Sequence, residues 1–62
     1  MSEEEARSAL QSIYAKLQAA GIKTAENQVE AWFQQIRMLG KGYFMQPEAA
    51  EFINQLKMKY GL

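Results

Sequence analysis

Apolar residues recur every three or four positions over the first twenty residues, the spacing that places side chains on one face of a helix. Ser2 and Glu5 precede this stripe and have the spacing of a capping box, in which each side chain accepts a hydrogen bond from the other residue's backbone amide. Gly21 follows the stripe and favours the left-handed conformation that ends many helices. We therefore predict a first helix over residues 2–20, with an apolar stripe of Ala6, Leu10, Ile13, Leu17 and Ala20.

A second apolar stripe begins after a polar segment and ends before Gly40. Asn27 and Glu30 have the spacing of a helix cap and its partner carboxylate, and Thr24 is a second candidate for the cap. The pattern predicts a helix over residues 25–39 with a stripe of Val29, Trp32, Phe33, Ile36 and Leu39. We expect Trp32 and Phe33 to lie in the core.

The third stripe begins after Pro47, which suits the first position of a helix because the amide that it lacks would be unpaired there. Gly61 ends this helix, predicted over residues 47–60. Its stripe consists of Ala49, Phe52, Ile53, Leu56 and Tyr60. No segment alternates with a period of two, so no strand is expected. The chain is predicted to be a single all-α domain over residues 1–62, a small three-helix bundle, with a dimer as the variant in which a second copy completes the core.

Residues 28–38 read QVEAWFQQIRM, and this string resembles the third, DNA-reading helix of homeodomains. The resemblance implies a helix that enters the major groove of DNA. It covers this stretch alone, because residues 1–27 contain one predicted helix where the family has two. Gln35 also stands where the family has an adenine-reading Asn, and Ile36 stands where it has a basic residue. The residue types that match are those of Val29, Trp32, Phe33, Gln34, Arg37 and Met38.

Two uncharged groups of residues lie outside the stripes. Gln34, Gln35 and Met38 share one side of the second predicted helix. Tyr43, Phe44 and Met45 are three large apolar residues in a row within a predicted loop. They have two interpretations: they fold inward and cap the core, or they form an exposed anchor of the kind enriched at protein interfaces. We predict a partner-binding site made of Tyr43, Phe44, Met45, Gln34, Gln35 and Met38, with Met58 as a further candidate for the same patch.

The residue inventory excludes most catalytic chemistry. The chain has no His and no Cys, so it offers no base that titrates near neutral pH, no thiolate and no typical zinc ligand. We expect a protein that is not an enzyme, with no cofactor, no metal site and no small-molecule substrate.

The predicted location is the cytoplasm. Met1 is followed by Ser and three Glu, unlike the basic and then apolar start of a secretory signal. No apolar run approaches the roughly 20 residues of a membrane span, so no membrane partner is expected.

The expected function is therefore binding. The first hypothesis is a small regulatory or adaptor protein that binds a protein partner, or a second copy of itself, through the uncharged site. Accessory proteins of phages and mobile elements have this size. The alternative is a DNA-binding transcriptional regulator, although seven basic and seven acidic residues give no basic excess. In that alternative, Gln34 and Gln35 contact DNA bases. The phosphates are contacted by Arg37, Lys41, Lys57 and Lys59.

Overall fold

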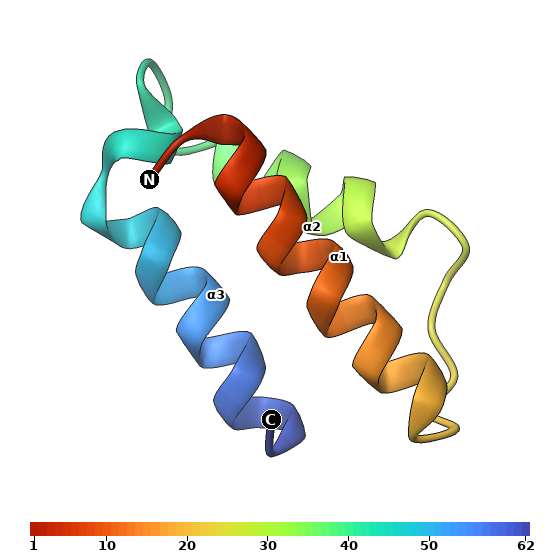
Figure 1. The fold of residues 1–62 in the computed structure, drawn as a ribbon. Coiled ribbons are helices and arrows are strands. Elements are labelled where there is room, and N and C mark those ends of the chain that lie inside the picture. Colours follow the sequence, from red (N-terminus) through yellow and green to blue (C-terminus); the bar gives the residue numbers. More distant parts are fainter.

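The computed structural model describes residues 1–62 and contains three α-helices and one short 3-10 helix. They are α1 (Glu3–Ala19), α2 (Gln28–Arg37), η1 (Tyr43–Met45) and α3 (Pro47–Tyr60). Helices α1 and α3 run in the same general direction, and α2 runs back (Figure 1). Helix α1 packs against both other helices, whereas α2 and α3 contact each other less extensively. The predicted all-α three-helix bundle is confirmed.

Both ends of α1 have the predicted caps. The Ser2 hydroxyl accepts a hydrogen bond from the Glu5 amide at 3.1 Å, and the Glu5 carboxylate accepts one from the Ser2 amide at 3.1 Å. At the other end, Gly21 has a φ of 75° and the Ile22 amide donates to the Leu17 carbonyl at 2.9 Å. This is the Schellman arrangement, which pairs carbonyls that the end of a helix would otherwise leave free.

The start of α2 differs from the prediction. The helix begins at Gln28, three residues later than expected, and the Asn27 side chain makes no capping hydrogen bond. Asn27 has φ −97° and ψ 26°, outside the extended conformation that directs a cap side chain toward the helix amides. Glu30, the expected capping partner, instead pairs with the Arg7 guanidinium of α1. A contact between two helices has therefore replaced a local one.

Helix α3 starts and ends as predicted. Pro47 occupies the first turn, and Gly61 ends the helix with a φ of 70° while the Leu62 amide donates to the Lys57 carbonyl at 2.8 Å. Acidic side chains lie in the first turn of both α1 and α3, and lysines lie in the last turn of both. This placement complements the partial positive and negative charges at the two ends of a helix.

The core draws on all three helices and contains no buried polar residue. Trp32 and Phe33 are 5% and 2% exposed, which confirms the core prediction for both. The predicted stripes are wrong at Leu39, which is 37% exposed, and at Ala20, which is also exposed, because the chain has already left α2 and α1 at these points. Phe52 is only partly buried, where α2 and α3 leave space between them. The ten buried residues are Ala6, Leu10, Ile13, Leu17, Trp32, Phe33, Ile36, Ala49, Ile53 and Leu56.

None of the three helices has the length and apolar character needed to cross a bilayer.

Candidate functional site

The segment between α2 and α3 is more ordered than the predicted loop, because it contains the helical turn η1. Gly40 and Gly42 have φ values of 102° and 71°, which side-chain-bearing residues rarely adopt. The Met45 amide donates to the Gly42 carbonyl at 2.9 Å, which closes the turn. The Gln46 side-chain amide lies 3.4 Å from the Leu39 carbonyl and holds the two ends of the segment together. The chain therefore presents residues 43–45 on a closed, hydrogen-bonded support.

A series of contacts between aromatic rings connects η1 to the core. The Tyr43 ring meets the buried Phe33 ring edge to face, with 5.8 Å between centroids, and the Phe44 ring meets Tyr43 in the same way at 5.4 Å. Both are half-buried. Partial burial and the nearby Glu3 carboxylate raise the pKa of the Tyr43 hydroxyl. Tyr43 thus has a structural role as the contact between η1 and the bundle.

Met45 and Met38 point away from the core, with 74% and 84% of their surfaces exposed. Gln34 and Gln35 are exposed on α2, and Gln34 lies one helical turn before Met38. We refer to these residues of α2 and η1 as the methionine surface: Gln34, Gln35, Met38, Phe44 and Met45. Residues 43–45 therefore differ in burial: Tyr43 turns inward, Met45 is exposed, and Phe44 is half-buried.

Met58 is 81% exposed but lies apart from the other two methionines. Helix α3 starts next to η1, and Met58 comes eleven positions after Pro47. At 1.5 Å per residue, that places Met58 about 16 Å along the helix axis. The three methionines do not form one patch.

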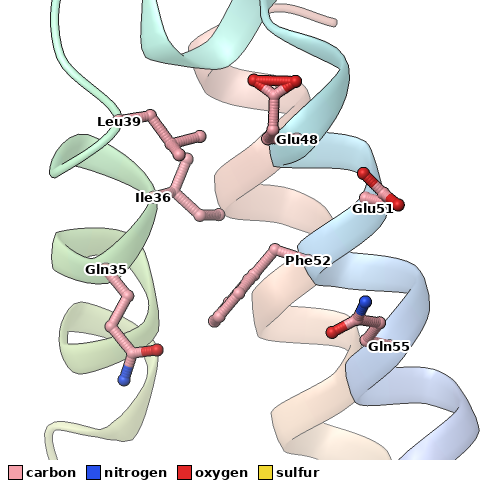
Figure 2. A pocket seen from close by; sticks show the side chains of 7 residues that line it. All are labelled: Gln35, Ile36, Leu39, Glu48, Glu51, Phe52 and Gln55. Atoms are coloured by element: carbon pink, nitrogen blue, oxygen red, sulfur yellow. The ribbon is translucent and has the colours of Figure 1, made fainter.

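A groove runs between α2 and α3 and has a volume of about 230 Å³. Ile36 and Leu39 point into it from the α2 side, and Phe52 points back from α3 (Figure 2). Helix α1 forms the back of the groove. The volume lies below the roughly 300 Å³ at which small-molecule pockets begin. The remaining lining residues are polar, namely Gln35, Glu48, Glu51 and Gln55.

Of the residues that line this groove, only Gln35 belongs to the site predicted from the sequence. Glu48, Phe52 and Gln55 recur at intervals of four and three, so their shared side of α3 can be read from the sequence. That side becomes a groove because α2 and α3 are separated there. The separation depends on how the helices cross, which cannot be read from the spacing of residues in the sequence.

The cations of the DNA-binding alternative are divided between the two ends of the molecule. Arg37 ends α2, and Lys41 lies in the following segment next to η1. Lys57 and Lys59 lie in the last turn of α3, at the opposite end of that helix from η1 (Figure 1). The structure brings Gln34, Gln35 and Arg37 together on α2 but does not bring all four cations to one face.

Comparison of the chain with protein-family models, with characterised proteins and with solved structures gives no significant match.

Proposed function

We propose that this chain is a small, non-enzymatic adaptor or regulatory protein that docks on a protein partner through the methionine surface. The observation that carries the proposal is the exposure of Met38 and Met45, 84% and 74%, on either side of one short segment. Single exposed apolar residues are common on protein surfaces. Met38, Met45 and the half-buried Phe44 all belong to the end of α2 and the short η1 that follows it, which is why we propose that they act as one contact.

The chemistry of the surface describes the partner that would fit it. Met side chains are flexible and polarisable, so they pack against apolar side chains of varied shape. The Gln34 and Gln35 amides can donate and accept hydrogen bonds at the edge of such a contact. Because the methionine surface carries no charge, the partner is expected to present an apolar anchor with polar groups around it, and salt is expected to weaken the complex little.

The test is a double substitution, Met38→Asp with Met45→Asp, in the chain used to capture its partner from the native host. Two carboxylates in a desolvated apolar contact would leave unpaired charges, so we expect the captured amount to fall about tenfold or more. Circular dichroism is expected to be unchanged, because neither side chain is part of the core.

Met58→Asp is the matched control, because Met58 has the same side chain and an exposure of 81% but lies at the other end of α3. It is expected to capture the partner as the unchanged protein does. Equal losses from Met58→Asp and from the double variant would contradict the proposal. A steep fall of binding to DNA fragments between low and physiological salt, without partner capture, would favour the DNA-binding alternative.

A further inference from the structure

We infer that the groove side of α3 is a self-association face, which pairs two copies of this chain with their α3 helices antiparallel. This inference does not rest on the proposed function, because the residues that carry it lie on α3, and the groove shares only Gln35 with the methionine surface. The residues that carry it lie in one row on α3, which we call the α3 seam: Glu48, Phe52, Gln55 and Lys59.

The seam follows from helical geometry. Phe52, Gln55 and Lys59 come four, seven and eleven positions after Glu48, close to one, two and three turns of a helix. Glu48, Phe52 and Gln55 all line the groove, and Lys59 continues the row toward the end of α3. One partly buried aromatic ring and one amide thus lie between an acidic end and a basic end, with Glu51 beside Glu48 at the edge of the acidic end.

The four seam residues are spaced symmetrically about one point on the helix. The midpoint between Glu48 and Lys59 along the helix is also the midpoint between Phe52 and Gln55. A two-fold axis through that point places Glu48 opposite Lys59 of the second copy, and Phe52 opposite Gln55 of the second copy. A contact of this kind is self-complementary, as a two-fold dimer requires.

Neither charged end of the seam has an ion-pair partner within one molecule. Eleven positions separate Glu48 from Lys59, about 16 Å along the helix, which is too far for an ion pair. The one ion pair of the structure joins Arg7 and Glu30, and the Lys59 ammonium instead lies 5.4 Å from the ring centroid of the adjacent Tyr60. The apolar part of the contact comes from Phe52 and from Leu39, which is 37% exposed at the groove.

Charge reversal combined with sedimentation equilibrium tests the inference. We expect the average mass of the unchanged protein to rise from monomer to dimer as its concentration approaches about 1 mM, the range of weak specific association. Glu48→Lys and Lys59→Glu each turn both inter-copy pairs into like-charge contacts. Each single variant is expected to raise the dimer dissociation constant roughly tenfold, because two exposed pairs are lost per dimer.

The double variant, Glu48→Lys with Lys59→Glu, restores opposite charges across the two-fold axis and is expected to regain dimerisation. Loss of folding cannot produce this result, since the double variant places both charges at the unfavourable ends of the helix. Lys57→Glu is the control, because it makes the same charge change in the same turn but lies off the seam.

Three results would overturn the inference. One is an unchanged protein that stays monomeric up to about 1 mM, a concentration at which a weak specific dimer would be populated. Another is a Lys57→Glu variant that dimerises as poorly as Lys59→Glu. The last is a double variant no better than either single one.

Discussion

Arg7 makes two contacts that set the position of α2 on α1. Its guanidinium pairs with the Glu30 carboxylate and lies 4.4 Å from the centroid of the buried Phe33 ring. The ion pair is exposed, so its own contribution to the free energy of unfolding is small. The two contacts together act on neighbouring turns of α2. Arg7 therefore specifies how the helices are aligned more than it stabilises them.

Glu5 is the residue through which pH is expected to act on α1. The hydrogen bond that the Glu5 carboxylate accepts from the Ser2 backbone amide, together with the Ser2 hydroxyl beside it, lowers the pKa of Glu5 below its ordinary value of 4.5. A lowered pKa in the folded state means that the unfolded chain takes up the proton first. The contribution of Glu5 to stability is thus present above pH 4.5 and is lost as pH falls through the lower, folded-state pKa.

Glu5→Gln should therefore reduce the pH dependence of stability in acid. Thermal unfolding followed by circular dichroism between about pH 6 and pH 3 is expected to show a smaller fall in the midpoint temperature than the unchanged protein shows. Glu4→Gln is the control, because it removes a first-turn carboxylate that makes no capping bond. If the midpoint temperature of Glu5→Gln falls with pH as steeply as that of the unchanged protein, the capping box is not the cause of the pH dependence.

At the scale of the element, the helices divide by how their ends are made. Helices α1 and α3 end on glycines with positive φ, and these ends could be predicted because the signals are local in the sequence. Helix α2 has only ten residues and no side-chain cap. Its start could not be predicted, because Glu30 forms an ion pair with Arg7 of a different helix. We expect α2 to depend on packing more than the other two helices do.

Gly21→Ala tests the end of α1. A side-chain carbon at Gly21 would meet no other atom within 4 Å, so the cost comes from the φ of 75° alone. We expect the free energy of unfolding to fall by about 1 kcal/mol, the cost of the left-handed conformation for an ordinary residue. Gly21→Asn should lose less, since Asn tolerates this conformation. Chemical denaturation measures both, and equal losses would show that conformation is not the cause.

At the scale of the whole molecule, the apolar stripes predict most of the core, because burial follows the helical period wherever helices pack closely. They fail at Ala20 and Leu39, which are exposed where the chain leaves α1 and α2. They hold only in part at Val29, Phe52 and Tyr60, which are partly buried. The three-helix fold and the candidate residues on α2 could be found in this way. The groove could not be found in this way, because it depends on the angle between α2 and α3 and not on the sequence of either helix.

Two leucines of the predicted stripes test this distinction. Leu10 is fully buried, and Leu10→Ala is expected to reduce the free energy of unfolding by about 2–5 kcal/mol. For a chain of this size the total is only about 3–9 kcal/mol, so the variant should lose a large fraction of its stability. Leu39→Ala should cost less than about 1 kcal/mol, because the side chain is already 37% exposed. Urea denaturation compares the two, and similar losses would place Leu39 in the core.

The shared direction of α1 and α3 has an electrical consequence. The dipoles of two parallel helices add. Glutamates lie at the starts of both helices and lysines lie at their ends, where each charge is opposite in sign to that end of the dipole. In a molecule whose formal charge is zero, the side chains of α1 and α3 thus form a negative pole and a positive pole, and Arg37 and Lys41 reduce the negative one. Two such molecules side by side in opposite senses would face each other with unlike poles, whereas the same sense would bring like poles together.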